Sequence, residues 1–130
     1  MIVLDASALI DLLLRGEGVE GIEDRMFAPG ESLNAPHLID LEVAQVLRRC
    51  RLAGELSDSR AEEAFEDLAA IPLQRYPHDV LLPRIWELRH HATAYDAAYL
   101  ALAEALDATL LTRDRRLAAS RGHRARIALV

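Results

Sequence analysis

Short apolar segments alternate with longer amphipathic ones along this chain, and the alternation limits the folds that it can adopt. Residues 2–4 form an apolar run with two β-branched side chains, too short to be a helix. Comparable segments at residues 32–35, 72–76, 109–112 and 127–130 are separated by helical patterns. This order is typical of an α/β fold with a largely parallel sheet.

The helical patterns have recognisable ends. The clearest begins at Pro36, which suits a first helical turn, and stops at Gly54. Its apolar stripe is predicted at Ile39, Val43, Val46 and Cys50, and that of the next helix at Ala61, Phe65 and Leu68. The predicted helices are residues 6–15, 19–27, 36–54, 59–71, 80–91, 95–106 and 113–120.

Length and composition indicate one globular domain. A chain of 130 residues with 52% hydrophobic and 28% charged side chains can bury a single core, so we expect one domain over residues 1–130. Asp5 interrupts the N-terminal apolar run, which argues against a secretory signal, and no apolar stretch is long enough to span a bilayer. The single cysteine, Cys50, cannot form an intrachain disulfide. We therefore expect a cytoplasmic protein without membrane contact.

The charge distribution is more informative than the net charge of -6, which does not predict sequence-independent binding to nucleic acid. All 15 basic residues apart from histidine are arginine, and six of them gather near the C-terminus, at positions 113, 115, 116, 121, 124 and 126. Arginine suits phosphate recognition, although the codon bias of a genome would give the same composition.

Four acidic residues stand where an apolar or capping residue is expected. Asp5 and Asp114 follow predicted strands, whereas Glu42 and Asp96 fall on the inward faces of predicted helices. Helix capping is an alternative for Asp5, for Asp114 and for Asp96, which forms a capping box with Thr93. Capping does not explain Glu42, whereas a shared site at the carboxyl edge of a parallel sheet explains all four.

Such a set of carboxylates points to a hard divalent cation. Without one, the carboxylates would repel one another and take up protons, whereas Mg²⁺ or Mn²⁺ prefers oxygen ligands. Metal-bound water can hydrolyse a phosphodiester without a serine, cysteine or histidine catalyst. Ser7 and Thr112, each two residues from an acid, are expected either to orient ligands or to cap helices. His90 and His91 are adjacent, so a zinc site is not expected.

A glycine pattern at residues 16–21 matches the dinucleotide-binding motif GxGxxG. That motif needs a strand directly before the glycines, and here the predicted helix 6–15 intervenes. We interpret these residues as a loop between helices.

The segments IVLDAS, LEVAQVLRR, TAYDAAYLALA and LLTRD, in this order, resemble a PIN domain, specifically the VapC-like ribonuclease toxins of bacterial toxin-antitoxin pairs. The resemblance covers nearly the whole chain and implies a five-stranded, mainly parallel sheet in an α/β/α sandwich. It implies Mg²⁺- or Mn²⁺-dependent endoribonuclease activity, a homodimer, and inhibition by a small VapB-like antitoxin laid across the active-site groove. The implied catalytic and metal-binding residues are Asp5, Glu42, Asp96 and Asp114.

The same resemblance makes three nearby arginines, Arg113, Arg115 and Arg116, candidates for contacts with the RNA backbone. Relatives often have glycine where this chain has Asp107, and a smaller residue in place of Arg113. Asp40 is not expected to be a ligand, because two positions along a helix rotate it about 200° from Glu42, toward solvent.

Three other functions stay open at this point. A housekeeping PIN nuclease would share the acidic site, and a non-catalytic protein-binding module would bind no metal. A phosphotransferase of the haloacid dehalogenase type also begins with a strand that ends in aspartate, but it needs a second aspartate where this chain has Ser7.

Overall fold

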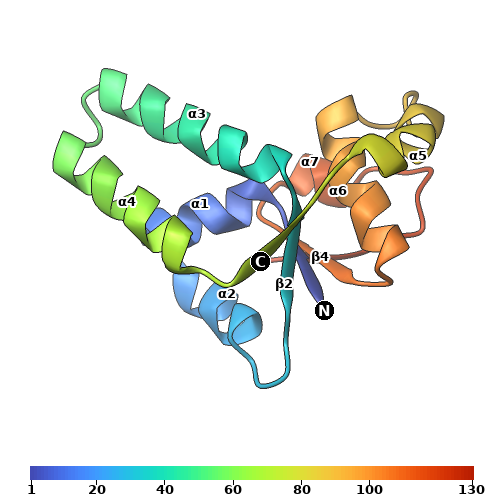
Figure 1. The fold of residues 1–130 in the computed structure, drawn as a ribbon, viewed down its shortest axis with the longest axis horizontal. Helices are drawn as coiled ribbons and strands as arrows, with labels where there is room; N and C mark the ends of the chain where they lie inside the picture. Colours follow the sequence, from blue (N-terminus) through green and yellow to red (C-terminus); the bar gives the residue numbers. More distant parts are fainter.

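The computed structural model describes residues 1–130 and has a five-stranded sheet between two groups of helices (Figure 1). The strands are β1 (Ile2–Leu4), β2 (Leu33–Pro36), β3 (Leu73–Tyr76), β4 (Thr109–Thr112) and β5 (Arg126–Leu129). Their order across the sheet is β3-β2-β1-β4-β5, and every neighbouring pair is parallel. The predicted α/β/α sandwich is confirmed, with a sheet that is parallel throughout.

The helices follow the predicted order. They are α1 (Ala6–Leu14), α2 (Val19–Met26), α3 (Leu38–Leu52), α4 (Asp58–Ala70), the 3-10 helix η1 (Asp79–Leu81), α5 (Leu82–Glu87), α6 (Ala94–Ala105) and α7 (Arg115–Ala118). In Figure 1, α1 to α4 lie on one side of the strands, and α5 and α6 on the other. None of the helices is both long enough and apolar enough to cross a membrane.

One predicted helix is shorter than expected. Residues 80–91 were expected to form a single helix, but η1 ends at Leu81 and α5 covers only Leu82–Glu87. Pro83 lies in the first turn of α5, where its missing N–H costs nothing but where it cannot continue a preceding helix. Residues 88–92 form a turn that leads into α6.

The core is built around β1 and α6. All three residues of β1 are buried, and α6 is buried continuously from Ala97 to Ala103. Its alanines let the helix axis approach β1, β2 and β4 closely. The first turn of α6, which carries Asp96, is therefore anchored by a rigid element.

The buried stripe of α3 differs from the predicted one. Ile39 and Val43 are buried as predicted, but the stripe continues through Leu47, while Val46 and Cys50 are only partly buried. The predicted stripe through Val46 and Cys50 and the observed stripe through Leu47 both have helical spacing, so the sequence pattern alone did not decide between them. The row that contains Glu42 and Val46 instead lines a cleft.

A similar one-position difference occurs on α4. Phe65 was predicted to face inward, yet it is 43% exposed, whereas Ala64 and Leu68 are buried. The prediction for Phe65 was wrong because the neighbouring row, which starts at a small alanine, packs closer to α1 and α3.

The strand order places a topological switch point beside β1. From β1 the chain adds β2 and β3 on one side, and then returns to add β4 and β5 on the other. In parallel sheets a ligand crevice opens at such a point, beyond the carboxyl ends of the two strands. Asp5 follows β1 and Asp114 lies two residues beyond β4.

The glycine pattern at residues 16–21 does not follow a strand. Residues 15–18 connect α1 to α2, and Gly21 lies within α2. The interpretation of this segment as a connection between helices, without a phosphate-binding turn, agrees with the structure.

Candidate acidic site at the carboxyl edge of the sheet

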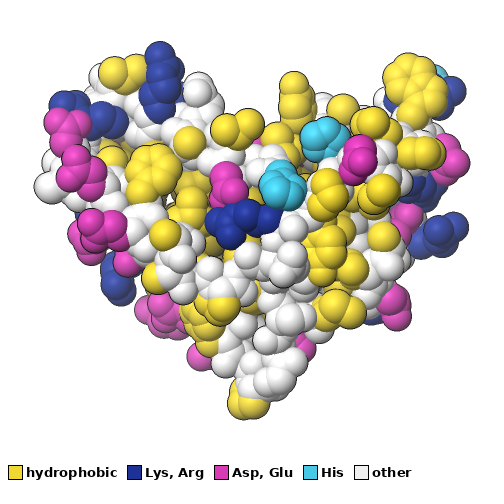
Figure 2. All heavy atoms as spheres, viewed as in Figure 1, with side chains coloured by type: hydrophobic (Ala, Val, Ile, Leu, Met, Phe, Trp, Pro, Cys, Tyr) yellow, Lys and Arg dark blue, Asp and Glu magenta, His cyan; other side chains and the backbone are white.

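Four separate elements bring the predicted acids to one cleft of about 630 Å³. Asp5 comes from the end of β1, Glu42 from α3, Asp96 from the first turn of α6, and Asp114 from the segment between β4 and α7. In the space-filling view the outline is hollowed between the α3–α4 lobe and the α5–α6 lobe (Figure 2). The exposed side chain of Tyr95 also lines the cleft.

Asp5 is almost completely buried, with 7% of its surface exposed, and one of its oxygens is fully engaged. Its Oδ2 accepts hydrogen bonds from the Ser7 hydroxyl, from Thr112 Oγ1 at 2.9 Å and from the Ser7 N–H at 3.3 Å. The last bond also caps α1. Asp5 therefore acts as a cap through Oδ2, and none of these bonds occupies Oδ1.

The Ser7 and Thr112 hydroxyls connect the ends of β1 and β4. Ser7 Oγ accepts from the Arg113 N–H at 2.9 Å, and Thr112 Oγ1 accepts from the Asp114 N–H at 2.9 Å. Both hydroxyls contact the Asp5 carboxylate, the arrangement expected of groups that orient a ligand. They fix Asp5 relative to the backbone that carries Asp114.

Glu42 is held by a residue that the sequence analysis missed. The buried Tyr99 donates its hydroxyl to Glu42 Oε2 at 2.7 Å. Burial raises the pKa of Glu42, the bond from Tyr99 opposes this, and the charges of Asp5 and Asp96 raise the pKa further. Two features of the sequence could have indicated Tyr99. It lies one helical turn beyond Asp96 on α6, and a buried tyrosine needs a hydrogen-bond partner for its hydroxyl.

Asp96 combines a capping contact with a nearby cation in the first turn of α6. Its N–H donates to the Thr93 hydroxyl at 3.1 Å, as the capping box predicted, and its Oδ2 lies 3.9 Å from Arg116 Nη2. Burial raises the pKa of Asp96, Arg116 lowers it, and Asp5 and Asp114 raise it.

Asp114 both caps α7 and lines the cleft. Its Oδ1 accepts from the backbone N–H groups of Arg116 at 2.8 Å and Leu117 at 3.2 Å. Its Oδ2 takes no backbone bond and lies 3.8 Å from Arg116 Nη2. Capping and a place in the site are thus compatible for Asp114, as they are for Asp5.

The donor set fits a hard divalent cation by its chemistry. Glu42 and Asp96 have raised pKa values partly because neighbouring carboxylates repel them, and a cation relieves this repulsion. No three acidic, histidine or cysteine side chains converge as a preformed metal cage. The four acids line the walls of the cleft instead of meeting at one point.

The three candidate arginines lie in different surroundings. Arg113 donates to Asp11 Oδ2 at 2.6 Å and to the Glu17 carbonyl at 2.7 Å, which ties it to α1 and the following loop. Arg116 lies beside the acids with its side chain 80% exposed, and Arg115 is exposed without an ion pair.

Two further acids have structural partners outside the cleft. Asp40 does not line the cleft, as expected, but it forms a two-bond ion pair with Arg75 at 2.6 and 2.8 Å instead of pointing freely into solvent. Asp107 ends α6 in the left-handed region, with φ 49°, and its carboxylate accepts from Arg126 at 2.7 Å. Asp107 thus adopts the backbone geometry that glycine favours.

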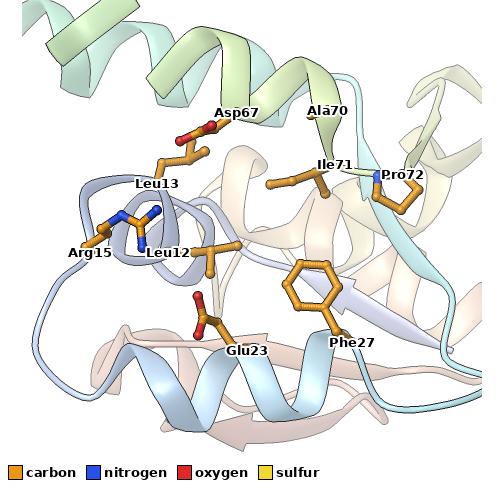
Figure 3. Close-up of a pocket in the computed structure, with 9 residues that line it drawn as sticks. All are labelled: Leu12, Leu13, Arg15, Glu23, Phe27, Asp67, Ala70, Ile71 and Pro72. Atoms are coloured by element: carbon orange, nitrogen blue, oxygen red, sulfur yellow. The ribbon is translucent and has the colours of Figure 1, made fainter. Parts of the chain in front are cut away.

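A separate hollow of about 300 Å³ lies between α1, α2 and the end of α4. Figure 3 shows Phe27, the residue after α2, facing Ile71 across it, with Glu23 and Asp67 at its rim. None of the four acids of the cleft lines this hollow, so it is not part of the acidic site.

The fold and the acidic cleft define a PIN-type α/β protein. Residues 2–122 match the family model of the PIN domain, and the chain belongs to this family. It is similar to Ribonuclease VapC1 of Mycobacterium tuberculosis (strain ATCC 25618 / H37Rv), with 46% identity over 98% of this chain and 96% of that protein.

Solved structures share the fold of this chain. PAE2754 from Pyrobaculum aerophilum is 26% identical, with a TM-score of 0.70 over 97% of this chain and 81% of that one. VapBC2 from Rickettsia felis, solved bound to a DNA fragment from their promoter, has a TM-score of 0.73 at 12% identity and covers 99% of this chain and 98% of that one. The second likeness concerns the fold alone.

Proposed function

We propose that this chain is a metal-dependent endoribonuclease that hydrolyses RNA phosphodiester bonds as the toxin of a toxin-antitoxin pair in the cytoplasm. The observation that carries the proposal is the convergence of four carboxylates from four elements on one cleft at the switch point of the sheet. The 46% identity to a protein named Ribonuclease VapC1 supports RNA as the substrate.

Asp5, Glu42 and Asp96 would hold Mg²⁺ or Mn²⁺, and Asp114 would complete the site. A bound cation of this kind supplies a nucleophilic water and offsets the negative charge that develops on phosphate. The cleft has no lysine, cysteine or histidine, and the hydroxyl of Ser7 is engaged with Asp5 Oδ2 and the Arg113 N–H, which supports hydrolysis without a side-chain nucleophile.

The remaining residues of the site orient these acids. Ser7 and Thr112 keep Asp5 Oδ2 engaged, so that Oδ1 is the oxygen available for a ligand. Tyr99 does the same for Glu42 by binding Oε2. Arg116 lies next to Asp96 and Asp114, where its guanidinium can attract a phosphate that the carboxylates alone would repel.

A small VapB-like antitoxin is the proposed inhibitor. The cleft combines its acids with apolar side chains, among them the 72% exposed Leu41 and the 63% exposed Tyr95. A short peptide with apolar anchors and a basic residue fits such a surface. Exposed apolar side chains at Val80, Leu82 and Trp86 support the proposed homodimer, which can assemble further with the antitoxin.

Induced expression in bacteria tests the proposal. Wild type is expected to arrest growth and to generate new RNA ends at defined positions, whereas Asp5→Ala is expected to do neither. Glu62→Ala, an exposed acid on α4, is the matched control and should behave as wild type. New RNA ends without growth arrest would favour a housekeeping nuclease. Purified protein that cleaves no RNA in the presence of Mg²⁺ and binds no Mg²⁺ would favour a non-catalytic module.

A further inference from the structure

A second pocket, of about 390 Å³, adjoins the acidic cleft where the turn after α5, the start of α6 and α7 meet. We call it the basic pocket. Its polar lining residues are Arg89, His90, His91, Thr93, Arg116 and Ser120, and its one acid is Asp96. Asp96 also lines the acidic cleft, so the two pockets are contiguous.

The basic pocket contrasts with the rest of the protein in charge. The chain has a net charge of -6, and the acidic cleft holds four carboxylates and a single arginine, Arg49. Two arginines against one carboxylate make the adjoining pocket the cationic side of this edge, and His90 and His91 add imidazole groups to its lining. A polyanion that reaches the acids is therefore attracted from this side.

Arg116 stands at the border between the two pockets with its donors available. Its Nη2 lies 3.9 Å from Asp96 Oδ2 and 3.8 Å from Asp114 Oδ2, too far for a direct hydrogen bond. By contrast, Arg75 and Arg84 each donate two or more short bonds to carboxylates. The guanidinium of Arg116 thus keeps its donors for a ligand.

Two other lining residues of the basic pocket, His91 and Arg89, are held in place by neighbouring groups. Gly122 has φ +80°, and a Cβ at this position would lie 2.3 Å from Cδ2 of His91, so the backbone packs directly against the imidazole ring. Arg84 donates to the Gly122 carbonyl at 3.2 Å and secures this loop. Arg89 lies over the Trp86 ring, 4.9 Å from its centroid, and donates to the Trp86 carbonyl.

We propose that the basic pocket binds a backbone phosphate of the RNA strand adjacent to the phosphodiester that reacts at the acidic cleft. This inference rests on the proposed function. A strand that crosses the acids passes Asp96 on one side and enters the basic pocket, where guanidinium and imidazole N–H groups match phosphate oxygens. A contact with a neighbouring phosphate carries no base information but fixes the register of the strand, and hence which bond is cleaved.

Steady-state cleavage tests the role of Arg116 and His91 as positioning residues. The substrate is an RNA oligonucleotide that spans a mapped cleavage site. Arg116→Gln and His91→Gln are each expected to raise KM about tenfold, the effect of one lost charge-assisted hydrogen bond, and His91→Gln should leave kcat unchanged. Arg25→Gln is the matched control, because this exposed arginine lines a pocket with Met1 and Thr109, at the opposite edge of the sheet.

Salt dependence provides a readout that a merely structural role would not change. For single-stranded RNA, loss of one phosphate contact lowers the slope of log binding constant against log salt concentration by about 0.7. Arg116→Gln is expected to show this decrease, and Arg25→Gln is not. An unchanged slope and KM in Arg116→Gln would overturn the subsite while leaving the nuclease proposal intact.

A neutral methylphosphonate placed at single linkages identifies the bound phosphate. One linkage next to the cleavage site should weaken wild-type binding about tenfold and have no effect in Arg116→Gln, because the two changes remove the same contact. Oligonucleotides with and without a 5′-phosphate form the second arm. Sensitivity to the terminal phosphate alone would assign the pocket to strand ends and overturn the backbone proposal. Wild type that cleaves no RNA would overturn the proposed function itself.

Discussion

The hydrogen bond from Tyr99 to Glu42 makes a specific prediction for metal affinity. Tyr99→Phe removes only the hydroxyl, so the buried ring keeps its packing in α6 while Glu42 Oε2 loses its donor at 2.7 Å. We expect weaker binding of Mg²⁺ and Mn²⁺, because Glu42 then adopts more than one orientation and retains its proton to higher pH.

The size of the effect follows from the type of bond that is lost. A hydrogen bond to a charged group contributes about 1.5–3 kcal/mol, which corresponds to a loss of roughly 10- to 100-fold in affinity. The loss expected for a residue that orients a metal ligand is also about 10- to 100-fold. Because Tyr99 lowers the pKa of Glu42, its removal should also shift the acid limb of the cleavage profile to higher pH.

Titration calorimetry with each metal at constant pH measures the affinity, and the metal concentration for half-maximal cleavage provides a second value. Tyr76→Phe is the matched control. It removes a hydroxyl that donates to Asn34 Oδ1 at 3.0 Å, outside the acidic cleft. Tyr76→Phe should retain wild-type metal affinity, even if losing this hydrogen bond lowers its free energy of unfolding. Wild-type affinity in Tyr99→Phe would refute the assignment of Glu42 as a ligand oriented by Tyr99.

Three further changes test the energetics of the fold. Glu42→Gln should stabilise the metal-free protein at neutral pH, because the folded-state pKa of Glu42 is raised above its ordinary value of 4.5. The destabilising effect of Glu42 is therefore absent below pH 4.5 and complete above the raised pKa. Melting temperatures measured across this pH range, with chelator present, should show the difference between the variant and wild type. Arg15→Gly should raise the free energy of unfolding by about 1 kcal/mol in urea, because Arg15 ends α1 at φ 53°, whereas Arg15→Ala keeps the Cβ and should bring no such gain. Gly122→Ala should lower that free energy by about 1–3 kcal/mol through its clash with His91, and a second change, His91→Ala, should recover part of the loss.

The sequence was sufficient to predict elements whose signals are local. Alternating apolar runs and amphipathic helices predicted the order of strands and helices, and parallel strands place their carboxyl ends at one edge. Asp5 and Asp114 could therefore be placed together without knowledge of the strand order. The helix break before Pro83 also has a local signal, because proline cannot continue a preceding helix, and it could have been predicted from the sequence.

Features that depend on packing between distant segments could not be predicted. Tyr99 and Glu42 are 57 positions apart, and their bond depends on how α6 and α3 are rotated. The same rotation decides that the Glu42 row of α3 lines the cleft while Leu47 enters the core. Likewise, the basic pocket arises only because α7 is brought back beside the first turn of α6.

Cleavage of RNA by the purified protein, with and without divalent metal, tests the central proposal most directly. Wild type and the Glu62→Ala control are expected to cleave in Mg²⁺ or Mn²⁺ and to stop in excess EDTA. Asp96→Asn removes one negative charge from the cleft at nearly constant volume and should abolish cleavage while the fold, followed by circular dichroism, stays intact. Full activity of Asp96→Asn, or of wild type in EDTA, would contradict the assignment of the four carboxylates as a catalytic metal site.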